Sequence, residues 1–123
     1  MPPTIETEFQ GEILTIRFTE ARIVDSETMR RTQNDLAAVL EQTPRRYLLL
    51  DLCQVQSLST AALGMLIGFQ KRCAERRVTL KLAAIAPEIL DAFRATRLDW
   101  LFDLYPDAAT ARESFPTQGL FFA

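Results

Sequence analysis

The sequence of 123 residues contains no histidine, only two cysteines and no long apolar run. Without histidine it lacks the usual general base, the serine–histidine and cysteine–histidine nucleophile pairs, and the commonest metal ligand. Cys53 and Cys73 are too few and too far apart in the sequence for a zinc site, so we expect reduced, small apolar residues. These absences predict a protein that is not an enzyme and that holds no metal and no cofactor.

The charges of the chain nearly balance, because sixteen acidic residues stand against fourteen basic ones for a net charge of −2. Such a chain presents no strong field to nucleic acid, and its paired basic residues fall within or after expected helices, where solvated faces explain them. The first residues, MPPTIETEF, lack the features of a signal peptide, and no apolar run approaches the roughly 20 residues that cross a bilayer. We therefore expect a soluble, cytoplasmic protein that binds neither nucleic acid nor membrane.

The hydrophobic pattern predicts a single α/β domain over residues 1–123, with a core at about 5–115 and a short apolar tail at 116–123. Two alternating segments joined by a turn indicate an N-terminal β-hairpin. Later strands alternate with helices, which indicates parallel pairing through right-handed crossovers. The expected sheet is therefore mixed and mostly parallel, with four to five strands and about four helices.

Element boundaries follow from the periodicity and the capping residues. Asp25 or Ser26 is expected to cap the first helix, Pro44 to end it, and Asp107 to cap the last helix. The expected strands are 5–9, 13–18, 47–52, 78–83 and a short one within 100–105, and the expected helices are about 27–42, about 60–76, one from residue 87, and about 108–115.

The segment Tyr47–Leu66 carries the most functional information. Its apolar run at 48–50 is typical of a strand covered on both faces. That strand is expected to end at Asp51, and a polar loop then leads to a helix whose first turn carries Ser59 and Thr60. Unpaired backbone N–H groups and the helix macrodipole make a helix start favourable for a phosphate. We therefore expect function to depend on these two hydroxyls.

Two roles are compatible with a hydroxyl at this position. As an N-cap it would satisfy one or two backbone N–H groups and stabilise the helix by about 1 kcal/mol. As a phosphate acceptor it would gain about −1.5 to −2 charges, which the start of the helix tolerates. A partner pressed against the neighbouring apolar surface would not tolerate that charge, because the charge would be desolvated there.

A helical wheel gives this helix two different faces. The expected core face comprises Ala62, Leu63, Leu66, Ile67, Phe69, Cys73 and Ala74. The opposite, solvent-facing side carries no charge for two turns and holds Ala61, Gly64, Met65 and Gly68. Two glycines inside a helix cost roughly 1 kcal/mol each against alanine, so the pattern indicates a surface where another backbone comes close. Two occupants remain open, a partner protein or a neighbouring helix of the same domain.

Together these features resemble a STAS domain of the anti-sigma factor antagonist kind. The resemblance covers about residues 5–115 in element order and is sharpest at the strand 48–52 and at Val55, Leu58, Ser59, Thr60, Leu63, Gly64 and Leu66. Weaker similarities are Val24 and Asp25 before the first helix, and Leu98, Leu101 and Phe102 near the end. The resemblance implies a switch protein. Unphosphorylated, it binds an anti-sigma factor that is also a serine/threonine kinase and so frees a sigma factor.

The resemblance also implies roles for individual residues. Thr60 falls on the acceptor serine of the family, and Ser59 falls on the aspartate that precedes it. Departures from the family pattern are Ala61 for the second hydroxyl, Ala62 for the usual glycine and Arg97 for a common glycine. The candidates for phosphorylation are therefore Thr60 and, second, Ser59. The candidates for partner binding are the solvent-facing residues of the wheel, Ala61, Gly64, Met65 and Gly68, together with Asp25.

Two functions are therefore expected. The first is a regulatory protein, monomeric when free, that binds an anti-sigma kinase until phosphorylation breaks the complex. The alternative is a STAS scaffold or interaction module that is not phosphorylated, which the missing aspartate favours. Catalysis is disfavoured, because no lysine or carboxylate is spaced to activate Ser59 or Thr60 as a nucleophile.

Overall fold

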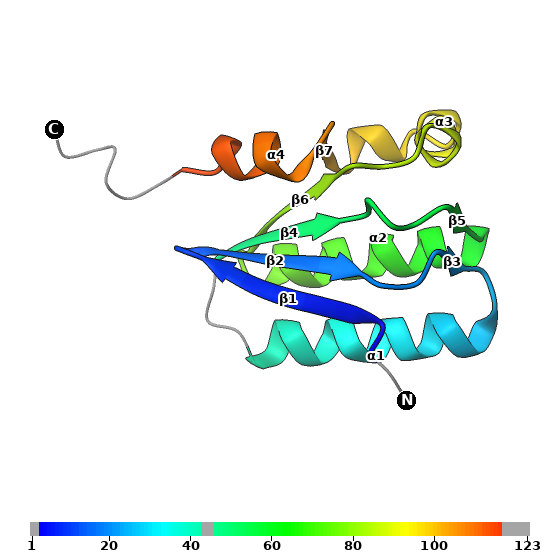
Figure 1. Ribbon diagram of the computed structural model, residues 1–123, viewed down its shortest axis with the longest axis horizontal. Helices are drawn as coiled ribbons and strands as arrows, with labels where there is room; N and C mark the ends of the chain where they lie inside the picture. The colour runs from blue at the N-terminus through cyan, green and yellow to red at the C-terminus, as the bar shows by residue number, and fades with distance from the viewer. Residues whose placement is uncertain (1–2, 43–45, 117–123) are drawn as a thin grey trace, which may run out of the picture.

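The computed structural model describes residues 3–42 and 46–116. A five-stranded sheet in the order β1-β2-β4-β6-β7 forms its centre, and a two-stranded sheet, β3-β5, lies at one end of the molecule (Figure 1). The strands are β1 (Ile5–Gln10), β2 (Ile13–Phe18), β3 (Arg22–Ile23), β4 (Tyr47–Asp51), β5 (Ser57–Leu58), β6 (Thr79–Ala83) and β7 (Asp103–Tyr105). The helices are α1 (Ser26–Gln42), α2 (Thr60–Glu75), α3 (Pro87–Ala95), the 3-10 turn η1 (Leu98–Trp100) and α4 (Ala108–Ser114).

Strand pairing in the large sheet is mixed and mostly parallel, as expected. β1 runs antiparallel to β2, and the pairs β2–β4, β4–β6 and β6–β7 are all parallel. Gly11 closes the hairpin between β1 and β2 with a positive φ of 61°, a conformation that glycine adopts without steric cost. The expected hairpin, parallel sheet and α/β class are therefore confirmed.

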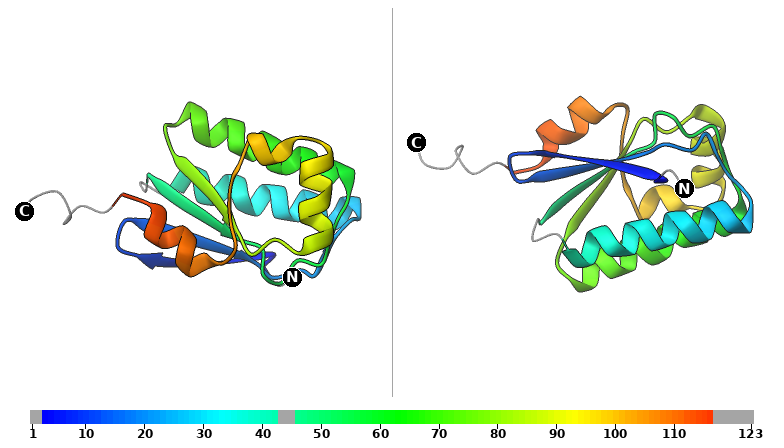
Figure 2. Two further views of the ribbon diagram at one scale, coloured as in Figure 1. Left: turned by 90° about the horizontal axis from the view of Figure 1, so that it is seen from above. Right: turned by 60° about the horizontal axis from the view of Figure 1, so that its bottom comes forward.

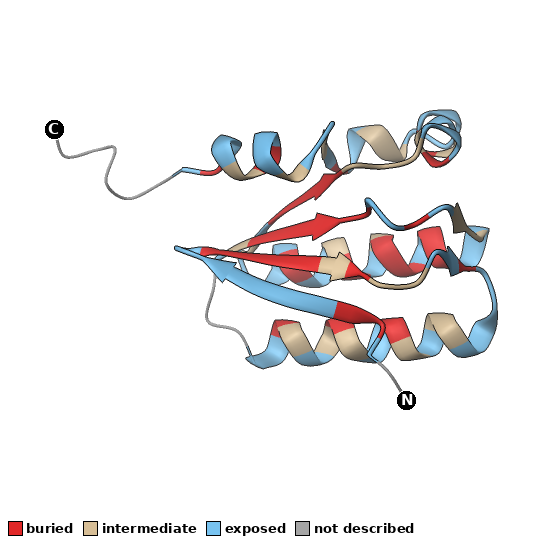
Figure 3. Cartoon of the chain, viewed as in Figure 1, coloured by how far each residue is buried: buried red, intermediate tan, exposed pale blue. Residues whose placement is uncertain are grey.

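The sheet carries helices on both of its faces (Figure 2). On the larger face, Leu48 and Leu50 of β4 belong to a core cluster with residues of α1, α2 and α3. On the other face, Leu49 packs with Ala111 and Phe115, at the C-terminal helix α4. The apolar run at 48–50 is thus covered on both sides, which confirms the sequence interpretation. The central strands are largely buried, while the outer sides of the helices are exposed (Figure 3).

Some local expectations were wrong. Cys53 is exposed, whereas only Cys73 is a buried apolar residue. Ala74 is exposed although the wheel placed it on the core face. The short strands β3 and β5 and the turn η1 were not expected. Pro44 and the tail at 117–123 lie outside the described residues. Among the described helices, none is both long and apolar enough to span a membrane.

Candidate protein-binding site at the start of helix α2

Ser59 is the N-cap of α2. Its backbone is extended (φ −78°, ψ 166°), and its Oγ accepts a hydrogen bond from the backbone N–H of Ala62 at 3.1 Å. Its carbonyl accepts the first helical bond, from the N–H of Leu63 at 3.0 Å. This geometry is the usual one for a capping serine. The expected helix start is therefore confirmed, and the cap is Ser59 rather than Thr60.

Thr60 is the first residue of α2, and its side chain is exposed to solvent. Among the described residues, no group is hydrogen-bonded to its hydroxyl. The two neighbouring hydroxyls therefore differ in their surroundings: Ser59 is engaged with the helix that it caps, and Thr60 is open to solvent. An exposed hydroxyl at the positive end of a helix is chemically able to carry a phosphate.

The loop between β4 and α2 is anchored at both of its ends. Leu52 and Val55 are buried, and the N–H of Val55 donates to the Leu52 carbonyl at 3.0 Å. The N–H of Gln56 donates to the Ala21 carbonyl at 2.7 Å, and β5 then pairs in parallel with β3. Because β3 leads into α1 and β5 leads into α2, the starts of the two helices lie side by side (Figure 1).

Asp25 lies at this shared end and caps α1. Its Oδ2 accepts the backbone N–H of Thr28 at 2.9 Å. The hydrogen bonds from Thr28 favour the charged carboxylate and hold the pKa of Asp25 below its ordinary value. Asp25 is exposed, and so is the apolar Val24 next to it, at 39%. The structure thus places the expected partner-binding Asp25 close to the start of α2, with a structural role of its own.

Ala61, Gly64 and Gly68 lie on the exposed side of α2. A Cβ atom built on either glycine would meet no other heavy atom within 4 Å, so no part of the described chain requires glycine there. The neighbouring helix α1 lies beside these glycines across a small groove and leaves them exposed, so it accounts for only part of the face that the wheel described. We call the set Thr60, Ala61, Gly64 and Gly68 the α2 surface. It is uncharged and open.

Met65 does not belong to the α2 surface. The expectation that its side chain faces solvent is wrong, because it is only 8% exposed and packs in the core. The buried arc of α2 is wider than the wheel indicated, since α1 packs beside it. Met65 instead lines a small groove between the two helices, about 100 Å³ in volume, together with Gln33, Leu36, Gly64, Gly68, Phe69 and Arg72.

Asp51 ends β4, as expected, and has a structural role there. Its side chain is buried, and its Oδ1 accepts the backbone N–H of Cys53 at 3.0 Å, which turns the chain into the loop. Its Oδ2 accepts a hydrogen bond from Arg17 Nε at 3.4 Å, and this contact raises the pKa of Arg17. Within residues 3–42 and 46–116, no group of three or more His, Cys, Asp or Glu side chains is placed to hold a metal ion.

The sequence located the two hydroxyls but not the contact that positions them. The pairing of β3 with β5 joins Arg22 to Ser57 and Ile23 to Leu58. A strand of two residues has no measurable alternation, so the hydrophobic pattern could not reveal it. The only signal was the apolar pair Ile23 and Leu58, of which Ile23 is fully buried.

Comparison with known proteins agrees with this fold. Residues 4–111 match the STAS domain family. An anti-sigma factor antagonist from Mycobacterium paratuberculosis superposes with a TM-score of 0.79 at 22% identity, covering 90% of this chain and 92% of that one. An anti-sigma-factor antagonist (STAS) domain protein from Planctomyces limnophilus gives a TM-score of 0.75 at 18% identity, covering 87% and 93%.

A third similar structure is SpoIIAA, a cell fate determinant of Bacillus, in its phosphorylated form. It has a TM-score of 0.66 and 12% identity, and the match covers 89% of this chain and 96% of that one. No sequence among curated proteins matches significantly. At these identities the likeness to the solved structures establishes the fold alone, whereas the family match covers most of the sequence. The chain belongs to the STAS domain family.

Proposed function

We propose that this protein is an anti-sigma factor antagonist whose binding to an anti-sigma factor kinase is abolished by phosphorylation of Thr60. The observation that carries the proposal is the exposed Thr60 hydroxyl, which lies at the start of α2 beside the open, uncharged positions Ala61, Gly64 and Gly68. The similar structures of anti-sigma factor antagonists support it, as does the phosphorylated state in which SpoIIAA was solved.

The chemistry of the switch follows from where the charge would be placed. A phosphate adds about −1.5 to −2 charges, and the start of a helix stabilises a negative charge by about 0.3–1 kcal/mol. The protein itself therefore keeps its fold. A partner that covers the α2 surface would have to bury that charge against uncharged groups, which costs several kcal/mol. Phosphorylation then acts on the complex and not on the free protein.

Thr60 is preferred over Ser59 because of the contact that Ser59 already makes. A phosphate on Ser59 would replace the hydroxyl that accepts the Ala62 N–H at 3.1 Å, whereas a phosphate on Thr60 disturbs no hydrogen bond within the described residues. A kinase also needs access to the hydroxyl, and Thr60 is the more exposed of the two.

Mass spectrometry can locate the modified residue. In the protein isolated from its native host, trypsin should release Tyr47–Lys71 as one peptide, because no lysine or arginine lies between Arg46 and Lys71. Fragment ions would then separate Ser57, Ser59 and Thr60. Phosphate on Thr60 supports the proposal.

Binding measurements with each purified anti-sigma factor kinase of the host test the switch itself. Thr60→Glu should lose at least tenfold in affinity with an unchanged melting temperature. Thr110→Glu is a matched control, because it adds the same charge to the first turn of α4, on the other face of the sheet. Equal affinities of wild type and Thr60→Glu for every kinase that binds would contradict the proposal.

A constitutive STAS scaffold remains the second candidate, and the chain offers one observation in its favour. Ser59 stands where the resemblance places an aspartate, and it uses its side chain only as a helix cap. In this case the α2 surface would contact a permanent partner or another copy of the fold. Size-exclusion chromatography distinguishes the two functions, because a scaffold should form a stable high-order assembly and a switch protein should elute as a monomer.

A further inference from the structure

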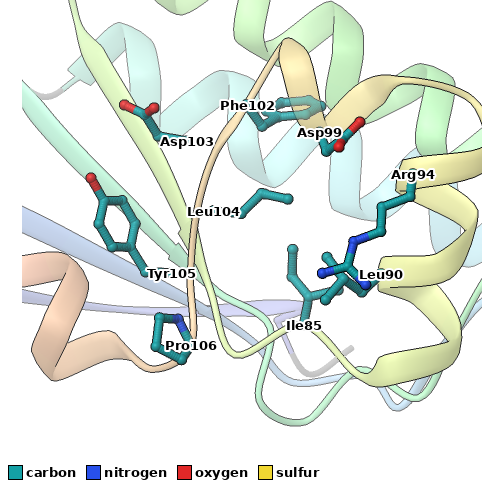
Figure 4. A pocket seen from close by; sticks show the side chains of 9 residues that line it. All are labelled: Ile85, Leu90, Arg94, Asp99, Phe102, Asp103, Leu104, Tyr105 and Pro106. Atoms are coloured by element: carbon teal, nitrogen blue, oxygen red, sulfur yellow. The ribbon is translucent and has the colours of Figure 1, made fainter.

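A second concave site lies away from the α2 surface, between strand β7 and helix α3 (Figure 4). It has a volume of about 510 Å³, within the range of about 300–1,000 Å³ typical of ligand sites. No residue of α1 or α2 lines it. The residues that line it are Ile85, Leu90, Arg94, Asp99, Phe102, Asp103, Leu104, Tyr105 and Pro106.

One wall of this groove is the free edge of the sheet. β7 is the last strand in the order and, within residues 3–42 and 46–116, pairs only with β6. The carbonyl of Tyr105 faces β6, since it accepts the N–H of Ala84 at 3.1 Å. Backbone groups of successive strand residues point to opposite sides, so the N–H and C=O of Leu104 point outward. Within the part of the chain that the structure describes, neither group has a hydrogen-bond partner.

This free edge is short. Pro106 has no backbone N–H, and the N–H of Phe102 already donates to the Leu98 carbonyl at 3.2 Å. Leu104 is therefore the residue that can offer both a donor and an acceptor to an added strand. An edge this short resists the continuation of a whole sheet. It leaves one donor and one acceptor for pairing with a single residue of an extended segment.

The groove also offers contacts for side chains. Ile85, Leu90 and Leu104 are partly buried. Leu104 points toward Ile85 and Leu90, whereas Asp103 and Tyr105 point to the other side of the strand (Figure 4). The Arg94 guanidinium lies beside Leu90 (Figure 4). Asp99 also lines the groove, but among the described residues Arg94 forms no ion pair with it or with any other acid, so the guanidinium can pair with a carboxylate of a ligand.

We propose that this groove binds an extended peptide segment of a partner protein, which pairs with Leu104 as an added strand. Strand addition beside a helix supplies backbone hydrogen bonds for affinity and side-chain contacts for selectivity. Alternate residues of the peptide face the groove. One of them places an aliphatic side chain against Ile85 and Leu90, and the next residue on that face places a carboxylate near Arg94. The preferred motif is therefore an aliphatic residue and an acidic residue separated by one position.

A nuclear magnetic resonance titration tests this proposal. The probe is a blocked pentapeptide with the order threonine, valine, threonine, glutamate, threonine, added to the isotope-labelled full chain up to several millimolar. The amide signals of Ile85, Leu90 and Leu104 should shift with the peptide concentration. The same peptide methylated on its three central backbone nitrogens should not shift them, because strand pairing needs those N–H groups.

Charge reversal supplies the matched control. Arg94→Glu should weaken binding of the pentapeptide by about three- to tenfold, as expected for an exposed ion pair that becomes a repulsion. A pentapeptide with lysine in place of glutamate should bind Arg94→Glu better than wild type. Arg22→Glu, which changes an exposed arginine of β3, should leave both affinities unchanged.

Five results would overturn the proposal, and the first four concern the peptide. These are no shifts at millimolar peptide, shifts confined to residues outside the groove, equal binding of the methylated peptide, and equal binding to Arg94→Glu. Self-association of the chain without any peptide, with the same signals affected, would also overturn it, because the occupant would then be a second copy. None of these results bears on Thr60, so the proposed switch stands or falls separately.

Discussion

The backbone N–H of Ser59 donates a hydrogen bond to the carbonyl of Ile23, at 3.1 Å. This bond joins the residue that caps α2 to the strand that leads into α1. Ile23 belongs to β3, and Ser59 directly follows β5, which pairs with β3. The start of α2 is thus fixed to the rest of the fold before the helix begins. A charge added at Thr60 cannot be relieved by movement of a loose loop, so a partner at this surface has to respond to it.

Substitution of the two neighbouring hydroxyls should give different stabilities. Ser59→Ala is expected to lower the free energy of unfolding by about 1 kcal/mol, because it removes the acceptor for the Ala62 N–H. Thr60→Ala should change it by no more than about 0.5 kcal/mol, since the hydroxyl has no partner among the described residues. Urea denaturation followed by circular dichroism measures both. An equal loss in Thr60→Ala would mean that Thr60 shares the capping role.

We expect the glycines of the α2 surface to lower the free energy of unfolding and to allow a partner backbone to come close. Gly64→Ala is expected to raise the free energy of unfolding by about 0.5–1 kcal/mol, because helical glycine is costly and the new Cβ meets nothing within 4 Å. The same variant should weaken partner binding if another backbone approaches there. Thermal unfolding and a binding titration on one preparation measure both effects.

A control for this trade-off lies on the same helix. Ala74 is exposed near the C-terminal end of α2 and outside the α2 surface. Ala74→Gly should destabilise the helix by about 1 kcal/mol without changing partner affinity. If Gly64→Ala stabilised the protein and bound its partner as tightly as wild type, the glycines would have no role in docking.

Long periodic segments were predictable from the sequence, and so were the capped helix starts. The helix expected from about Thr60 begins there, and the cap expected at Asp107 is confirmed by its Oδ1, which accepts the Thr110 N–H at 2.7 Å. A helix cap is a local feature, because the capping side chain binds a backbone N–H only three residues further along the chain. The paired strands β3 and β5 were not predictable, because pairing of two residues depends on tertiary contact alone.

Burial of individual side chains was less predictable where a second element covers the first. Met65 lies on the side that the wheel gave to solvent, but α1 packs close enough to bury it. Lys81 occupies the polar position of an alternating strand, yet it is only 8% exposed. The alternation of apolar and polar residues along a strand indicates which residues share a face of the sheet. It does not indicate whether a helix such as α4 covers the polar face.

Acid should weaken the caps of α1 and α4. The pKa values of Asp25 and Asp107 lie below the ordinary value of 3.8, mainly because backbone hydrogen bonds from Thr28 and Thr110 favour the charged forms. A carboxylate whose pKa is lower in the folded state contributes stability above its unfolded pKa, and loses it as the pH falls through the folded pKa. As the pH falls from 3.8 through the lower pKa values of the folded protein, the melting temperature of wild type should therefore fall more steeply than that of the double variant Asp25→Asn and Asp107→Asn. Parallel profiles for the two proteins would contradict this assignment.

Lys81 should control the ionisation of Tyr105. Its Nζ donates to Tyr105 Oη at 2.8 Å and to Ser114 Oγ at 2.9 Å, and it forms no ion pair within the described residues. The hydrogen bond from Lys81 is the main cause that lowers the pKa of Tyr105 below 10.0. Lys81→Met should therefore raise this pKa toward its ordinary value, because the neighbouring cation and donor are removed.

Ultraviolet titration of the phenol measures this shift in a Tyr47→Phe background, which leaves Tyr105 as the remaining tyrosine. Lys81→Met keeps most of the buried methylenes, so the free energy of unfolding should change by less than about 1.5 kcal/mol. Lys71→Met removes an exposed lysine from α2 and should leave the titration curve unchanged. An unshifted curve in Lys81→Met would show that Tyr105 ionises independently of Lys81, and that the contact holds α4 to the sheet without influencing the phenol.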